Sequence, residues 1–80
     1  MKIEITMPRL RPEMKSGILC AWKVCPGDKI KAGDVMFEVE TDKVVSEIEA
    51  AQDMTIITLA AEEGDEVAAD SVIAYAEVDD

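Results

Sequence analysis

Apolar residues recur at every second position along much of this 80-residue chain, and turn-forming residues interrupt them at short intervals. Ile3, Ile5 and Met7, for example, alternate with polar residues. A period of two is typical of a β-strand with one buried face, whereas an amphipathic helix has a period of 3.6 residues. Glycine, proline and aspartate separate such runs, as they do in β-sandwiches and barrels. The sequence therefore predicts an all-β fold.

The expected strands are short because the turns are close together. In the run that begins at Val35, we expect Val35, Phe37 and Val39 on one face. In the run 44–49, the even-numbered residues share one face and the odd-numbered residues share the other. The predicted strands cover residues 2–7, 17–24, 29–32, 35–40, 44–49, 55–61 and 72–78.

The chain also resembles itself when it is displaced by 37 residues. The segment GDKIKAGDVMF at 27–37 aligns with GDEVAADSVIA at 64–74, and Trp22 in the strand before the first segment aligns with Leu59. Such a repeat predicts two similar halves of four strands each, arranged as a sandwich or flattened barrel with approximate internal two-fold symmetry. A chance similarity among β-turn residues is the alternative interpretation.

A chain of this length holds one small domain, which we place over residues 1–80 with a core at about 3–78. It has no histidine, which removes most nucleophile and general-base arrangements, so we do not expect an enzyme by itself. Cys20 and Cys25 are five residues apart and would point to opposite faces of a strand, which argues against a mutual disulfide. We expect both thiols to be reduced and packed among apolar neighbours. No metal site, signal peptide or membrane span is predicted, and we expect a cytoplasmic location.

The formal net charge of −10 is unevenly distributed. All eight lysine and arginine residues lie in residues 1–43 beside seven acidic residues, while residues 44–80 hold eleven acidic residues and no base. Nucleic acid and anionic membrane surfaces are therefore poor partners. The acidity either keeps the chain soluble or steers it toward basic partner surfaces.

Lys43 is the last basic residue of the chain and lies at the joint between the two halves of the repeat, within FEVETDKVVSEIEA at 37–50. Two-residue hairpin loops favour Asn-Gly or Asp-Gly because both central residues need positive φ, a demand that Asp42-Lys43 meets poorly. Turn chemistry therefore gives no reason for a lysine here. A solvated surface charge is the ordinary explanation of a lone lysine, but its place in the repeat makes Lys43 the candidate functional residue.

Several segments resemble the lipoyl domain of 2-oxo acid dehydrogenase complexes, a biotin/lipoyl-attachment domain. They are MPRL at 7–10, GILCAW at 17–22, GDKIKAGDVMFEVETDKVVSEIEA at 27–50 and EEGDEV at 62–67, and the resemblance covers about residues 3–78. It implies a flattened β-barrel of two four-stranded antiparallel sheets, each with two strands from each half. It also implies that the amine of Lys43 is joined to lipoic acid by an amide bond, in the carrier part of a dihydrolipoamide acyltransferase.

The resemblance also implies roles for neighbouring residues and for partners. Glu40, Asp42 and Val44 would help a ligase to recognise its target, although the two acids can instead serve solubility and Val44 can instead belong to the core. The implied partners are a lipoate ligase or lipoyl transferase, a 2-oxo acid dehydrogenase (E1), the acyltransferase core (E2) and dihydrolipoamide dehydrogenase (E3). The arm would carry acyl groups and reducing equivalents among their active sites. We expect the isolated domain to be monomeric.

Two other functions share parts of this pattern. A biotinyl carrier domain has the same fold, but its lysine is typically flanked by methionines, whereas Asp42 and Val44 flank Lys43. An unmodified β-sandwich that serves only protein interaction is the second alternative.

The chain also departs from the lipoyl-domain pattern at three places. Arg11-Pro12 follows Leu10 where a glycine is usual, in the loop that resembles the partner-recognition loop. Met54 and Asp70 replace customary turn glycines. At both positions we expect either an altered turn or a strained left-handed backbone.

Overall fold

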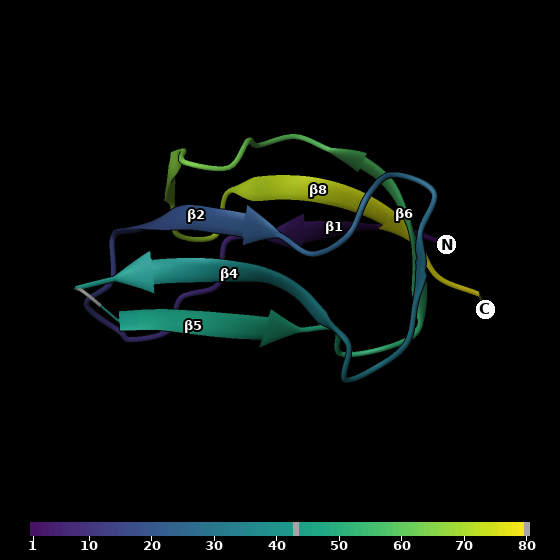
Figure 1. Cartoon of the computed structure of the whole chain (residues 1–80), viewed down its shortest axis with the longest axis horizontal. Helices are drawn as coiled ribbons and strands as arrows, with labels where there is room; N and C mark the ends of the chain where they lie inside the picture. The colour runs from purple at the N-terminus through teal and green to yellow at the C-terminus, as the bar shows by residue number, and fades with distance from the viewer. Residues whose placement is uncertain (43, 80) are drawn as a thin grey trace.

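The computed structural model describes residues 1–42 and 44–79, and over these residues the chain forms β-strands and no helix (Figure 1). Within the same residues, no helix has the length and hydropathy needed to cross a membrane. The molecule is elongated, with dimensions of 36 × 21 × 21 Å. The strands are β1 (Lys2–Thr6), β2 (Ser16–Trp22), β3 (Lys29–Ile30), β4 (Val35–Thr41), β5 (Val44–Glu49), β6 (Met54–Leu59), β7 (Glu66–Ala68) and β8 (Val72–Glu77).

The strands form two four-stranded antiparallel sheets that pack face to face. Their orders are β1-β8-β6-β3 and β5-β4-β2-β7. Each sheet takes two strands from the first half of the chain, β1 to β4, and two from the second half, β5 to β8. The predicted all-β flattened barrel is therefore confirmed, including the exchange of strands between the halves.

Equivalent backbone hydrogen bonds 37 residues apart confirm the internal repeat. The Gly27 N–H donates to the Ile56 carbonyl oxygen at 2.7 Å, and the Gly64 N–H donates to the Leu19 carbonyl oxygen at 2.7 Å. Gly27 and Gly64 both have a φ of 94°, a conformation that glycine adopts without strain. The two Gly-Asp turns thus have the same structure. The first is bonded to β6 in one sheet, and the second is bonded to β2 in the other.

The two departures in the turns have different outcomes. Asp70 occupies the position equivalent to Gly33 and has a φ of 72°, so the expected left-handed backbone is present there. Met54 instead begins β6, where it pairs with Ile30 and is only 7% exposed. Met54 does not have the expected left-handed backbone, and it is a core residue of a strand rather than a turn residue.

The core between the sheets is apolar, and no polar or charged residue that the structure describes is buried. Trp22 packs against its edge, with its ring 5.3 Å from the ring of Phe37, and the indole N–H donates to the Ala61 carbonyl oxygen at 3.0 Å. Burial of each large side chain contributes about 1.5–3 kcal/mol. The largest fully buried side chains are Phe37, Met7, Leu19, Ile56, Ile73 and Val39.

Two expectations from the sequence fail locally. Met36 is buried, at 6% exposed, although alternation places it on the outer face, because the pairing of β4 with β5 shifts register between Val35 and Phe37. Cys25 lies beyond the end of β2 and is exposed, so the prediction that it packs among apolar neighbours is wrong. Cys20 is half-buried, and both cysteines are free thiols.

Candidate functional site

The hairpin between β4 and β5 lies at the end of the molecule opposite the two termini (Figure 1). Thr41 pairs with Val44 and Glu40 pairs with Val45, so the strands remain paired up to a two-residue connection. Asp42, the first connecting residue, has a φ of 45°, a left-handed conformation that aspartate tolerates better than most residues. Lys43, the second, lies outside the described residues, so its role as the attachment site stays a prediction.

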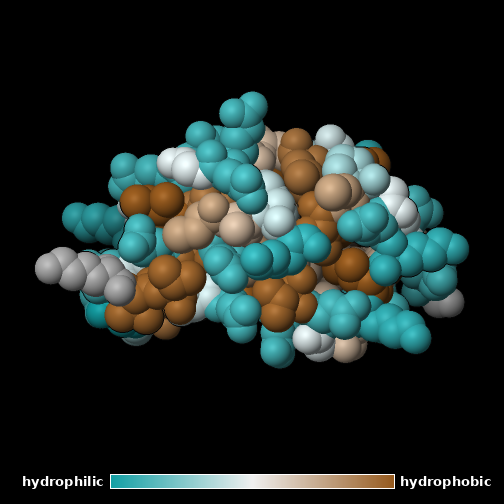
Figure 2. Space-filling view, in the orientation of Figure 1, coloured by the Kyte–Doolittle hydropathy of each residue, from teal (hydrophilic) through white to brown (hydrophobic). Residues whose placement is uncertain are grey.

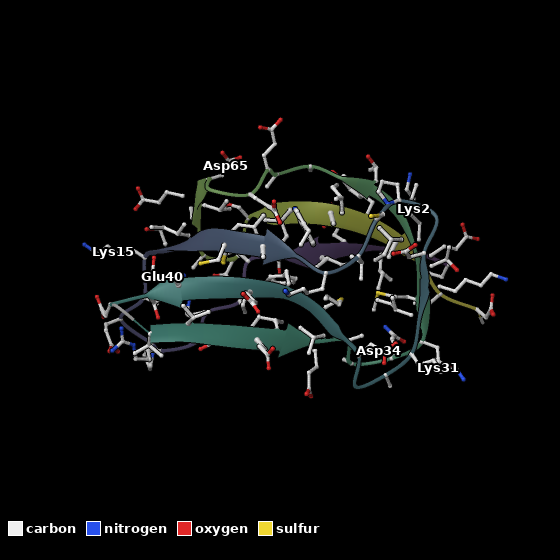
Figure 3. The ribbon with its side chains drawn as sticks, in the orientation of Figure 1. Lys2, Lys15, Lys31, Asp34, Glu40 and Asp65 are labelled. Atoms are coloured by element: carbon white, nitrogen blue, oxygen red, sulfur yellow. The ribbon has the colours of Figure 1, made fainter. Side chains whose placement is uncertain are left out.

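The described side chains beside this connection are accessible to a large partner. The Asp42 side chain is 77% exposed and Val44 is 60% exposed. The alternative that Val44 belongs to the core is therefore wrong. Glu40 is half-buried near the end of β4, where Figure 3 labels it. The structure thus brings together the three residues predicted for ligase recognition, and their role remains a prediction.

The loop between β1 and β2 contacts the hairpin through Arg11. Its guanidinium donates a hydrogen bond to the Asp42 carboxylate, and this bond, followed by the charge of Asp42, raises the pKa of Arg11 above its ordinary value. Arg9 anchors the same loop, because it lies 2.9 Å from the Asp70 carboxylate and donates to the Met14 carbonyl oxygen. The departure at Arg11 therefore lies directly beside the hairpin connection. The sequence carried no signal for either ion pair, since the partners are 31 and 61 residues apart.

A groove of about 380 Å³ opens between this loop and the hairpin. Gly17 forms part of its wall. A Cβ added to Gly17 would lie 2.8 Å from Cγ1 of the buried Val39. In the part of the chain that the structure describes, histidine, cysteine, aspartate and glutamate form no group of three or more that could hold a metal ion. Other residues that line the groove include Arg11, Met14, Lys15, Ile18, Glu40 and Asp42.

Comparisons with known proteins agree with this geometry. The model of the biotin/lipoyl family, described as "Biotin-requiring enzyme", matches residues 3–75. The dihydrolipoyllysine-residue acetyltransferase component of the pyruvate dehydrogenase complex from Rhizobium meliloti is 47% identical over 66 residues, which are 82% of this chain and 15% of that protein. The pyruvate dehydrogenase E1 component subunit beta of the same organism is 48% identical over 56 residues, which are 70% of this chain and 12% of that protein. The chain thus spans a small part of the curated relatives it matches.

A solved structure extends the likeness to the whole fold. The lipoyl domain of the 2-oxoglutarate dehydrogenase complex from Azotobacter vinelandii superposes with a TM-score of 0.79 at 29% identity, over 95% of this chain and 96% of that one. The family model covers most of the chain, and the strand order and the hairpin agree with the resemblance stated from the sequence. The chain belongs to the family of biotin/lipoyl-attachment domains.

Proposed function

We propose that Lys43 carries lipoic acid in amide linkage and that the domain moves acyl groups and reducing equivalents between the active sites of a 2-oxo acid dehydrogenase complex. One observation supports the proposal: Thr41 pairs with Val44, so only two residues connect the paired strands β4 and β5. The names of the relatives, components of pyruvate and 2-oxoglutarate dehydrogenase complexes, support the lipoyl group over biotin.

The residues around position 43 fit an attachment site. Such a site needs accessibility rather than an activated amine, because an ordinary lysine with a pKa of about 10.4 is acylated by a ligase that brings its own activated donor. Exposed flanking residues, Asp42 and Val44, leave room for that ligase. Amide formation would change the formal net charge from −10 to −11. A bound lipoyl group supplies a disulfide that accepts an acyl group together with two electrons and later releases both.

The protein part contributes tethering and recognition. A covalent arm replaces diffusion between enzymes with a high effective concentration. We propose as partners a lipoate ligase or lipoyl transferase, a 2-oxo acid dehydrogenase (E1), an acyltransferase core (E2) and dihydrolipoamide dehydrogenase (E3). We further propose that the chain works in the cytoplasm and that the isolated domain is a monomer without catalytic activity of its own.

Intact mass measurement after co-expression with a lipoate ligase tests the attachment. We expect a lipoyl increment in the wild-type chain and none in Lys43→Gln. Lys15→Gln is the matched control, because Lys15 lies at the same end of the molecule (Figure 3). We expect this substitution to leave the lipoyl increment intact. An unmodified wild-type chain with an active ligase, or an increment that survives in Lys43→Gln, would overturn the proposal.

Parallel co-expression with a biotin ligase separates the biotinyl alternative. We expect no biotin increment, because Asp42 and Val44 stand where biotinyl domains typically carry methionines. The lipoylated domain is then incubated with candidate 2-oxo acid dehydrogenases and their substrates. The dehydrogenase that adds an acyl group to it fastest identifies the complex that it serves.

A further inference from the structure

The loop between β1 and β2 is longer than the connection in the equivalent place of the second half. It spans residues 7–15, whereas residues 50–53 connect β5 to β6. Both connections cross from one sheet to the other. The shorter connection shows that the crossing itself does not need the greater length. The longer loop also carries three basic residues, Arg9, Arg11 and Lys15, whereas residues 50–53 contain none. Its additional residues are therefore available for a task other than connecting strands.

Contacts within the domain hold the β1–β2 loop in place. The Arg9 guanidinium lies 2.9 Å from the Asp70 carboxylate and donates to the Met14 carbonyl oxygen. The Met14 N–H donates to the Arg11 carbonyl oxygen at 3.0 Å and closes a turn with Pro12 at its second position, where the fixed φ of proline is favourable. The Met14 side chain is buried. Arg11 is therefore the first residue of an anchored turn.

The Arg11 side chain ties this anchored turn to the β4–β5 connection. Its guanidinium donates a hydrogen bond to the Asp42 carboxylate, and its Nε lies 3.8 Å from the Glu13 carboxylate. Asp42 has a φ of 45°, a sparsely populated conformation that persists where surrounding contacts hold it. Both side chains of the pair are exposed, Arg11 at 48% and Asp42 at 77%, and Figure 2 shows hydrophilic surface among hydrophobic surface at this end of the face in view. Because exposed ion pairs add little to the stability of a whole domain, we expect the effect of this pair to be local.

We propose that Arg11 is a positioning residue for the attachment of the arm: through its bond to Asp42 it holds the β4–β5 connection in the conformation that the lipoate ligase binds. This inference rests on the proposed function. Among the proposed partners, the ligase forms a bond at the connection itself, whereas the others react with the lipoyl group at the far end of the arm. In the ligase step, the amine of Lys43 displaces the activating group from the lipoyl carbonyl carbon and releases a proton.

The expected effect follows from the populations of the connection. A two-residue connection without glycine adopts several conformations unless a contact selects one of them. A ligase that binds one conformation shows an apparent affinity that falls in proportion to the population of that conformation. Loss of the Arg11 bond should therefore raise KM for the domain and leave kcat unchanged, because the bound complex is the same.

Steady-state lipoylation kinetics of the unmodified domain, with its concentration varied, test the proposal. We expect Arg11→Gln to raise KM about two- to fivefold, the range that an exposed ion pair can supply, with kcat and Tm close to the wild-type values. Arg11→Lys keeps the charge and should restore part of the loss. Lys15→Gln is the matched control, because it removes the same charge from the same loop but leaves the bond to Asp42 in place. Its KM should stay close to that of the wild type.

Backbone amide NMR of the same unmodified variants gives a readout that needs no ligase. We expect line broadening and faster hydrogen exchange at Asp42 and Val44 in Arg11→Gln, and wild-type behaviour in Lys15→Gln. An equal or lower KM for Arg11→Gln would overturn the positioning role. A higher KM with unchanged amide signals would also overturn it, because Arg11 would then act by contacting the ligase directly. A wild-type domain that an active ligase does not lipoylate would instead overturn the proposed function.

Discussion

Gly17 is expected to be a packing requirement of β2, and Gly17→Ala tests this. An added Cβ would lie 2.8 Å from Val39 Cγ1, 2.9 Å from Met14 Cε and 3.3 Å from Met7 Sδ. Met14 and Met7 can move, but the Val39 methyl belongs to a stiff β-branched side chain inside the core. Overpacking costs about 1–3 kcal/mol, and replacing glycine where its backbone is unstrained returns about 0.4–1 kcal/mol through the unfolded state. We expect the free energy of unfolding to fall by about 1–2 kcal/mol and Tm by about 5–15 °C.

A double-mutant cycle isolates the contact, with stability measured by urea and thermal denaturation. Val39→Ala removes the Cγ1 methyl, so Gly17→Ala should cost about 1 kcal/mol less in that background. Gly27→Ala is the control: its Cβ meets nothing within 4 Å, and its cost arises from a φ of 94°, so it should not depend on Val39. A Gly17→Ala chain as stable as the wild type, or a cost that is the same in both backgrounds, would refute the packing argument.

Two further variants test smaller features. Asp70→Ala should be about 1 kcal/mol less stable than Asp70→Gly in thermal denaturation. Both variants lose the Arg9 ion pair, but only alanine keeps a Cβ at a φ of 72°. Equal stabilities of the two variants would contradict this reasoning. In a Cys25→Ser background, Glu40→Gln should speed alkylation of Cys20 at pH 8 by about two- to threefold, measured by mass spectrometry. Burial first, and then the charge of Glu40, raise the Cys20 pKa and lower its thiolate fraction, so removing that charge lowers the pKa. An unchanged alkylation rate would show that the charge of Glu40 does not lower the thiolate fraction of Cys20.

The fold could be predicted because its main determinants are local in sequence. Burial of one face of a strand imposes a period of two, which the residues 3–7 and 35–39 show. Gly27 and Gly64 could be placed in turns because a φ of 94° excludes most other residues. The exception at Met36 arises from a register shift between β4 and β5, and a bulge of this kind depends on both strands.

The surroundings of the hairpin could be predicted only in part. The position of the connection between β4 and β5 follows from the alternation on either side of it. The contact of Arg11 with Asp42 does not, because an ion pair between exposed side chains far apart in sequence leaves no periodic pattern. Val45, Glu40 and Ile18 lie side by side across β5, β4 and β2, and this arrangement could be found only from the pairing registers of the three strands. Sequence reasoning thus located the hairpin, whereas the surface residues beside it could be identified only from the pairing registers.

The internal symmetry explains why the hairpin and the termini lie at opposite ends. β8 stands in the second half where β4 stands in the first, and β8 pairs with β1 just as β4 pairs with β5. The β4–β5 connection is therefore equivalent to the place where Val78 and Met1 meet, with the Val78 N–H donating to the Met1 carbonyl oxygen at 2.8 Å. Because a pseudo-two-fold axis relates these two places, they point in opposite directions along a molecule 36 Å long. Both termini therefore lie about the length of the molecule away from the hairpin (Figure 1).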